Sequence, residues 1–552
     1  MRLDESIEAL SKAEAYRECG LGDPSTLGPV GIRQTHISAV FLVGDRAWKL
    51  KKPVDLGFLD FSTLAKRRRF CEEELRINRR TAPEVYLGVD SVVRDGHGSL
   101  RVTADPGARE IVDVAVRMRR LPEGGLLDEQ LDRLGGEAGD PGVASGRARL
   151  GTLLARFAPD LAEFHAACST GEGIDEHGGP EGMRRQFEEN LDRLRPFAGD
   201  GPSSVLSERR WRRLRERAFA KLESERSRLM RRVREGRVRE GHGDLHAGNL
   251  CEVEGRLVAF DAIEFDRRLR CRDVACEVAH LAMDLDRRGM PAFAARWTKA
   301  YARASGDREV VDLAPLFRFH YAVVRALVEA IRSRDADVPE TERASSLASA
   351  RRYADLATGY LLPPSLVFTC GLQGSGKSTV ARAIARPLRA LVLRSDEVRK
   401  RLAGIAIDDR SGRDRQGGDL YGEAWTGRTY DRLLGSAEAA MRRGRHVVVD
   451  AAFPTAERRA AFVDLARSRT APWVLVEAIC DREEIGRRLA ARAADRREPS
   501  DADWAVYERA ERAFERPAEI PEPHRVAWSS DTPASAGASA GASAAIDRLG
   551  PV

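Results

Sequence analysis

A glycine-rich segment, residues 371–379, carries the pattern G-x-x-x-x-G-K-[ST] between an apolar run and a helix-like stretch. In such a segment the glycines let consecutive backbone N–H groups point at a phosphate, the lysine reaches the outer phosphate oxygens, and the next hydroxyl can bind Mg²⁺. The residues expected to bind ATP are Gly371, Gly374, Ser375, Gly376, Lys377, Ser378 and Thr379, with the Ser378 hydroxyl as a metal ligand. The pattern therefore predicts a site for ATP and Mg²⁺, and the alternative is a purely structural glycine turn.

A second set of polar residues, within 242–266, combines two carboxylates and an amide at a fixed spacing. Asn249 follows Asp244 by five residues, and Asp261 ends the apolar run 257–260. This D-x-x-x-x-N spacing is that of a kinase catalytic loop, and the hairpin pattern in between places the three side chains where two strands leave one loop. We expect Asp244 to take the proton of an acceptor group, and Asn249 and Asp261 to hold Mg²⁺. The alternative is a polar turn capped by Asp244.

Further charged residues follow the glycine-rich segment, at the ends of predicted strands and on one helix. Asp450 ends a buried strand, where an acid can hold Mg²⁺ through water. We expect Asp396 to orient an acceptor hydroxyl and Arg399 to bind an anionic group of the acceptor; the alternative is a helix N-cap with a surface arginine. Arg488 and Arg492 share a helix face and either close over the phosphates or form a solvated face.

The elements that must position these residues change along the chain. The first 120 residues have the pattern of a small sheet with one helix, since strand-like runs flank a single helical pattern at 64–80. Helical periodicity dominates from 150 to 358. From residue 365 onward strands and helices alternate, which predicts a parallel sheet. Pro363 and Pro364 mark the boundary between these two patterns.

Residues 1 to about 355 resemble the aminoglycoside phosphotransferase-like kinases, whose fold is related to that of the protein kinases. The likeness rests on two motifs around the predicted catalytic loop, 242–249 and 260–266, and on the stretches 48–53 and 72–75. The resemblance implies a nucleotide-binding lysine that is paired with a glutamate of the following helix. We expect these to be Lys49 and Glu74, with Lys51 and Glu73 as the alternatives.

This likeness does not extend to a protein kinase. No G-x-G-x-x-G precedes Lys49, and neither D-F-G nor A-P-E follows Asp261. The resemblance therefore implies a small-molecule hydroxyl acceptor, although the family name does not identify it.

Residues 366 to about 515 resemble the small P-loop kinases, a group that includes gluconate kinase, chloramphenicol phosphotransferase, zeta-type toxins and the polynucleotide 5'-kinases. The likeness rests on 371–379, 395–400, Asp450 and 488–492. Together the two resemblances imply a bifunctional, ATP-dependent phosphotransferase. Two alternatives stay open: the C-terminal module binds ATP as a regulatory switch, or it is a toxin-like kinase held in check by the first module.

The predicted fold class is α/β and α+β, with an N-terminal bilobal protein-kinase-like domain and a C-terminal doubly wound parallel sheet. We expect a first domain at 1–358, whose lobes meet near residue 120, and a linker at 359–364. A second domain is expected at 365–530, followed by a disordered low-complexity tail at 531–552.

Composition narrows the class of protein. The 552 residues exceed one compact core, and no apolar stretch approaches the roughly 20 residues that span a bilayer, so we expect a multi-domain cytoplasmic protein without a membrane partner. The net charge of the chain is only +6, and acidic and basic residues are interleaved along the sequence, which disfavours a nucleic-acid partner. The eight cysteines are scattered singly, which predicts neither a disulfide framework nor a zinc site. Oligomeric state and the identity of both acceptors stay open.

Overall fold

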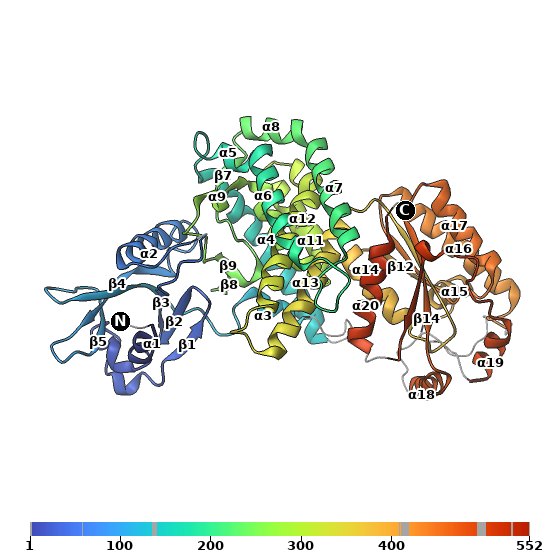
Figure 1. Cartoon of the computed structure of the whole chain (residues 1–552), viewed down its shortest axis with the longest axis horizontal. Coiled ribbons are helices and arrows are strands. Elements are labelled where there is room, and N and C mark those ends of the chain that lie inside the picture. Colours follow the sequence, from blue (N-terminus) through green and yellow to red (C-terminus); the bar gives the residue numbers. More distant parts are fainter. Residues whose placement is uncertain are drawn as a thin grey trace. The chain divides into compact units, whose positions relative to one another are not determined.

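The computed structural model of the chain describes residues 3–57, 59–134, 141–407, 409, 419–493, 504–531 and 534–550 (Figure 1). The chain forms two compact units. The first consists of Met1–Gln186 and Leu222–Phe317, and the second of Phe187–Lys221 and Arg318–Val552. The segment 359–364, expected to be a linker, lies in the second unit: residues 359–361 are the end of helix α13 (Glu340–Leu361), and 362–364 precede strand β11 (Leu366–Cys370).

The first unit contains an antiparallel sheet whose described strands have the order β1-β2-β3-β6-β4-β5. Their bounds are β1 Gly31–Gln34, β2 Ser38–Val43, β3 Arg46–Lys51, β4 Tyr86–Arg94, β5 Leu100–Thr103 and β6 Ile111–Arg119. Helix α2 (Leu64–Asn78) begins after Thr63, whose hydroxyl accepts the Lys66 N–H at 3.3 Å. Strands β2 and β3 form the hairpin predicted from the alternating pattern.

The two faces of this sheet pack against different parts of the chain. Successive residues of a strand point to opposite faces, so Trp48 and Leu50 join a hydrophobic cluster with Tyr16, whereas Ala47 joins a cluster with Cys71 of α2. Lys49 and Lys51, two and four residues after Ala47, therefore lie on the face that α2 covers.

Helices and two short antiparallel pairs make up the rest of the first unit. One pair is β7 (Val238–Glu240) with β10 (Cys271–Asp273), and the other is β8 (Leu250–Val253) with β9 (Arg256–Ala259). The helices are α1 Leu3–Leu10, α3 Leu127–Arg133, α4 Pro141–Ala167, α5 Asp175–Gly178, α8 Arg226–Arg234, α9 Arg267–Arg270, α10 Val274–Arg287 and α11 Pro291–Ala304. The loop between β7 and β8 holds the predicted catalytic motif, and the β8–β9 hairpin is the predicted one.

The second unit is built on a parallel sheet whose described strands have the order β12-β13-β11-β14-β15. The other strands are β12 Leu391–Arg394, β13 Val447–Asp450, β14 Trp473–Ile479 and β15 Arg525–Ser529. The connecting helices are α14 Lys377–Leu388, α15 Ser395–Ala403, α16 Glu423–Arg442, α17 Ala456–Ser468, α18 Arg482–Ala493 and α19 Trp504–Ala513. Because β11 is the central strand, the glycine-rich loop at its carboxyl end lies in the middle of the sheet edge. Together the two units confirm the predicted two-part α/β class.

Some helices contribute residues to both units, namely α6 (Pro180–Leu194), α7 (Glu208–Ser224) and α12 (Glu309–Ser333).

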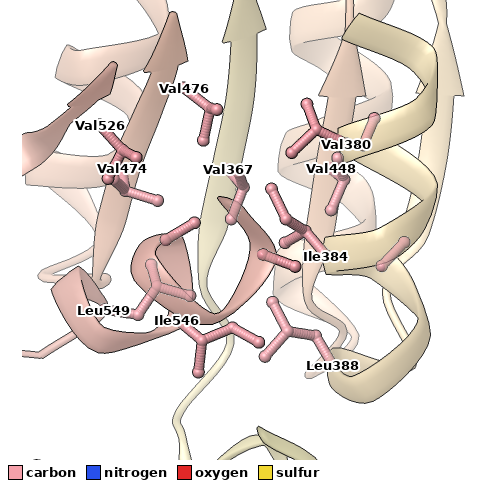
Figure 2. Close-up of a cluster of buried hydrophobic side chains, with 14 of the residues drawn as sticks. Val367, Val380, Ile384, Leu388, Val448, Val474, Val476, Val526, Ile546 and Leu549 are labelled. Atoms are coloured by element: carbon pink, nitrogen blue, oxygen red, sulfur yellow. The ribbon is translucent and has the colours of Figure 1, made fainter. Parts of the chain in front are cut away.

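The prediction of a disordered tail at 531–552 is wrong for Ala534–Arg548, which form helix α20. Alanine has the highest helix propensity, and small side chains let a helix approach its neighbours closely. Figure 2 shows Ile546 and Leu549 in one cluster with valines of four strands and with Val380, Ile384 and Leu388 of α14. The segment therefore packs closely against its neighbours, although its mostly small residues give it a low hydrophobicity.

Candidate active site

Two lysines of β3 converge on one glutamate of α2. The Lys49 and Lys51 ammonium groups donate to the two carboxylate oxygens of Glu74 at 2.8 and 2.6 Å. Lys49 also contacts Asp261 at 2.5 Å, whereas Lys51 contacts Glu264. Both candidate lysines thus pair with Glu74, but of the two only Lys49 reaches the predicted metal ligand Asp261.

The neighbouring glutamate belongs to another cluster. Glu73 accepts hydrogen bonds from Arg76 and from the buried Arg270, both at 2.8 Å. Glu74 instead is fully buried. Burial disfavours its charged form, but the two lysine ammonium groups outweigh that effect and lower the pKa of Glu74 to about 2. Of the two glutamates, Glu74 is therefore the one that joins the lysine site.

The carboxylate of Asp244 lies next to the side-chain amide of Asn249 and the rings of two histidines. The Asn249 side-chain amide donates to the Asp244 backbone oxygen at 3.0 Å and to its carboxylate at 3.2 Å. His246 Nε2 lies 3.5 Å and His280 Nδ1 3.6 Å from the two carboxylate oxygens. The structure thus brings Asp244 and Asn249 together as predicted, and adds His280 of α10.

The β8–β9 hairpin places Asn249 next to Asp261. The Phe260 N–H donates to the Asn249 carbonyl at 3.0 Å, and Asp261 follows directly. Asp261 has φ +62°, a left-handed conformation that is unusual for a residue with a side chain, and its N–H donates to the Tyr86 hydroxyl at 3.0 Å. Lys49, Glu74 and Asp261 are joined directly, and Asn249 and Asp244 lie beside them. These side chains provide amide and carboxylate oxygens, the ligands that Mg²⁺ prefers.

A buried glutamate of α10 fixes the backbone in front of Asp244. Glu277 Oε1 accepts the N–H groups of His242 and Gly243 at 2.6 and 2.7 Å. Its other oxygen lies 2.8 Å from His165 Nε2, and His165 Nδ1 lies 2.7 Å from the Tyr301 hydroxyl. Burial raises the pKa of Glu277, but these hydrogen bonds and the nearby histidines lower it to about 2.

Sequence reasoning missed this support. Its signal was an acid, Glu277, and a histidine, His280, within the otherwise apolar run 274–283. The ring of His242 is buried, and its Nε2 lies 3.0 Å from the Phe260 carbonyl, so this histidine packs against the loop. Burial lowers the pKa of His242.

In the second unit, the glycine-rich loop has the backbone that a phosphate requires. Gly371, Gly374 and Gly376 have φ of +139°, +79° and +89°, values that residues with side chains rarely adopt. A Cβ on Gly371 would lie 2.6 Å from the Ala478 carbonyl oxygen. Lys377 lies at the first position of α14 and donates to the Leu372 carbonyl at 2.6 Å.

Donors in this loop fit an anionic ligand. The Ser375 hydroxyl is buried, and among the described residues it has no hydrogen-bond partner. The first N–H groups of a helix lack intrahelical acceptors, so the beginning of α14 at Lys377 and Ser378 adds further donors, whereas the Thr379 N–H donates to the Gly376 carbonyl at 2.9 Å. The residues present therefore fit the phosphates of ATP.

The predicted acids of the second unit lie at the ends of adjacent strands. Asp450, at the end of β13, is buried, and its carboxylate lies 3.4 Å from Arg394 at the end of β12. Asp396 follows in the first turn of α15, where burial raises its pKa although Arg399 opposes the shift. Arg399 is buried over the Tyr421 ring at 4.6 Å, and its Nε has no hydrogen-bond partner among the described residues.

Arg488 contacts the backbone of the glycine-rich loop. Its guanidinium donates to the Gly374 carbonyl at 3.3 Å, and to the Ser530 hydroxyl and carbonyl at 2.7 Å each. Arg488 thus holds the loop in place, and its contact with phosphates stays a prediction. The side chain of Arg492 lies outside the described residues.

Residues 366–517 match the family model of an AAA domain. Proteins of Mycobacterium bovis and of two strains of Mycobacterium tuberculosis, each described as uncharacterized, are 29% identical over 515 residues, which is 91% of this chain and 96% of theirs.

Solved structures are similar to each part of the chain. An amicoumacin kinase in complex with AMP-PNP, Ca²⁺ and Ami is 11% identical with a TM-score of 0.35, covering 64% of this chain and 93% of that one. A choline/ethanolamine kinase family protein from Mesorhizobium loti is 12% identical with a TM-score of 0.36, covering 63% and 94%. The Mycobacterium tuberculosis APS kinase is 23% identical with a TM-score of 0.25, covering 34% and 98%.

Within the described residues, no helix combines the length and apolar character needed to cross a membrane.

Proposed function

We propose that the chain is a bifunctional ATP-dependent phosphotransferase in which each unit transfers the γ-phosphoryl group of ATP to a hydroxyl of a small molecule. The observation that carries this proposal is the contact of Lys49 with both Glu74 and Asp261, beside the Asp244–Asn249 pair. Phosphoryl transfer depends mainly on positioning and on charge neutralisation, and these residues supply both.

At the first centre, Lys49 binds ATP phosphate oxygens and Asp244 accepts the proton of the acceptor hydroxyl. The acceptor oxygen bonds to the γ-phosphorus while the bond from that phosphorus to the bridging oxygen of ADP breaks. The products are a phosphate ester, ADP and a proton. Asn249 and Asp261 would hold Mg²⁺, which would supply charge neutralisation. Glu277 and His280 keep the loop and the Asp244 carboxylate in position.

At the second centre, Lys377 and the backbone of the glycine-rich loop bind the phosphates, and Ser378 with Asp450 would hold Mg²⁺. Asp396 orients the acceptor hydroxyl and Arg399 binds an anionic group of the acceptor. The residues after Asp450 are alanines, so a neighbouring carboxylate that would activate water is absent from this stretch of sequence. That absence favours transfer to a bound acceptor.

The test is a panel of sugars, aminoglycosides, nucleosides and small alcohols incubated with the full chain, ATP and Mg²⁺. Mass spectrometry of the acceptors and coupled detection of ADP measure transfer. We expect at least one acceptor to gain a phosphoryl group together with acceptor-dependent ADP formation. ATP binding without any acceptor-dependent ADP would contradict the proposal and favour a nucleotide switch.

A further inference from the structure

A cavity of the first unit lies beside His165, the histidine that contacts Glu277. It has a volume of about 340 Å³ and is lined by residues of α4, β7, α10 and α11. Its charged and polar lining residues include Arg237, Arg239, Glu163, His165 and Tyr301. None of these residues belongs to the candidate active site as predicted from the sequence.

The cavity presents cationic groups. Arg237 Nε is buried without a hydrogen bond among the described residues, and its nearest carboxylate, Asp307, lies 3.9 Å away. Asp307 is already held by Arg232 at 2.7 and 2.9 Å, so it leaves Arg237 available for another anion. Buried donors without acceptors are costly, and an anionic ligand would relieve that cost.

Arg239 adds a second, fixed guanidinium. Its Nη1 donates to the carbonyls of Ala166 and Cys168 at 2.8 and 2.9 Å, which leaves the rest of the group for a ligand. Glu163 is the one acid among the described lining residues, and it is exposed. Two arginines against one solvated glutamate favour a small anion.

The inner wall of the cavity is connected to the catalytic loop by hydrogen bonds. His165 and Tyr301 line the cavity and bond to each other, and His165 bonds to Glu277. Glu277 in turn holds the N–H groups of His242 and Gly243, directly before Asp244. All members of this chain of contacts are buried, so a displacement of one is resisted by the others.

Strand β7 provides a second connection. Arg239 lies in β7, and Gly241 follows that strand at the beginning of the loop. A Cβ on Gly241 would lie 2.3 Å from Glu277 Oε1, so the backbone and the glutamate are in close contact there. A ligand that pulls on Arg239 therefore acts on the same segment as the Glu277 contacts.

We propose that this cavity is an effector site for a small anion, a phosphate or a carboxylate, whose binding changes turnover at the first catalytic centre through Glu277. The effect on turnover rests on the function proposed for that centre, whereas the binding of an anion to the cavity does not. Phosphate and carboxylate share the charge and geometry that arginine recognises, so both are tested.

The binding experiment uses the full chain with its nucleotide sites saturated by a non-hydrolysable ATP analogue. Inorganic phosphate and citrate are titrated separately by calorimetry at constant ionic strength. We expect one of them to bind, and Arg237→Gln to weaken that binding about tenfold, the effect of losing one charged hydrogen bond. Arg234→Gln, an exposed arginine on the preceding helix, serves as the matched control. Equal affinities in the two variants, or no binding of either anion, would overturn the site.

The coupling experiment measures acceptor-dependent turnover with and without the anion that binds. Tyr301→Phe keeps the ring but removes the hydroxyl that contacts His165, so we expect the anion still to bind while its effect on turnover falls. Equal effects on the wild type and on Tyr301→Phe, or no effect on the wild type, would overturn the coupling. If no acceptor is phosphorylated at all, the proposed function fails while the calorimetric result still decides the site.

Discussion

Glu74 is fully buried and yet ionised, because the ammonium groups of Lys49 and Lys51 contact its two carboxylate oxygens. The two lysines differ in their second partner. Lys51 is buried between Glu74 and Glu264, whereas Lys49 is partly exposed and reaches Asp261. A buried charge that loses its partner is strongly destabilising, while a partly exposed charge costs less when a contact is lost, because water can solvate it.

Lys51→Ala is expected to reduce the free energy of unfolding by about 3–5 kcal/mol, because Glu74 and Glu264 lose their shared cation. Lys49→Ala is expected to keep most of the stability but to reduce turnover at the first centre at least about 100-fold, the typical effect of losing one charge-stabilising group. Urea unfolding and acceptor-dependent turnover measure the two effects, with Lys52→Ala as the control. A stable Lys51→Ala variant with lost turnover would reverse the roles of the two lysines.

Glu277 makes stability depend on pH with a defined sign. Its folded pKa is about 2, below the ordinary value of 4.5, so its contribution is complete above pH 4.5 and is lost as the pH falls towards 2. This lowered pKa corresponds to about 3 kcal/mol of stability at pH 6, falling to roughly half of that at pH 3.

We therefore expect the difference in unfolding free energy between the wild type and Glu277→Gln to narrow by about half between pH 6 and pH 3. Chemical unfolding of the wild type and of Glu277→Gln at both pH values measures this difference, with a variant of the exposed Glu163, Glu163→Gln, as the control. A difference that stays constant over this pH range would mean that Glu277 is not held ionised by its neighbours.

At the scale of elements, both candidate sites lie where strands end. The glycine-rich loop connects β11 to α14, and the catalytic loop connects β7 to β8. Each depends on backbone that tolerates little change. Gly371 combines a positive φ with a close approach to the Ala478 carbonyl, whereas Gly444 has φ +74° with open space around it.

A comparison of alanine variants at these two glycines distinguishes the effect of backbone strain from that of a steric collision. Both Gly371→Ala and Gly444→Ala carry a strain of about 1 kcal/mol or more from the positive φ. We expect Gly371→Ala alone to abolish ATP binding at the second site, because its Cβ would displace the loop. Titration of a fluorescent ATP analogue and thermal unfolding measure the two effects. Retained ATP binding in Gly371→Ala would contradict the importance of this loop conformation.

Helix α20 gives another prediction at this scale. Ile546 is fully buried against α14, so Ile546→Ala is expected to cost about 2–5 kcal/mol of unfolding free energy. Ala544 of the same helix is exposed, and Ala544→Ser should change stability by less than about 0.5 kcal/mol. Urea unfolding followed by tryptophan fluorescence compares them. If both variants were as stable as the wild type, the segment would behave as an unattached tail.

At the scale of the whole molecule, each compact unit carries its own candidate site. The second unit also includes Phe187–Lys221, far from the parallel sheet in sequence. Arg210 of that segment is buried and lies 2.7 Å from Asp355 of α13 and 3.3 Å from the Ser543 hydroxyl of α20. The parallel sheet and its helices therefore depend on a segment outside the predicted second domain.

The sequence predicted those features whose signal is local. The glycine-rich loop, the Asp244–Asn249 spacing and the alternation of strands and helices each occupy one short segment. The sequence did not decide between Glu73 and Glu74. Adjacent helix residues point in different directions, and which of them faces the lysines depends on how the helix packs. The Glu277 contacts join α4, α10 and α11, and no local pattern reports such a meeting. Helix α20 was missed because small residues carry little hydrophobic signal even when they are buried.

The measurement that tests the central claim most directly is phosphoryl transfer from ATP across the acceptor panel, with the wild type beside Asp244→Ala and Lys377→Ala. Two independent centres predict that Asp244→Ala loses one acceptor-dependent activity, by about 100-fold or more, and keeps the other. Lys377→Ala should show the opposite loss. If either single substitution removed every acceptor-dependent activity, or if neither removed any, the account of two separate phosphotransferase centres would be contradicted.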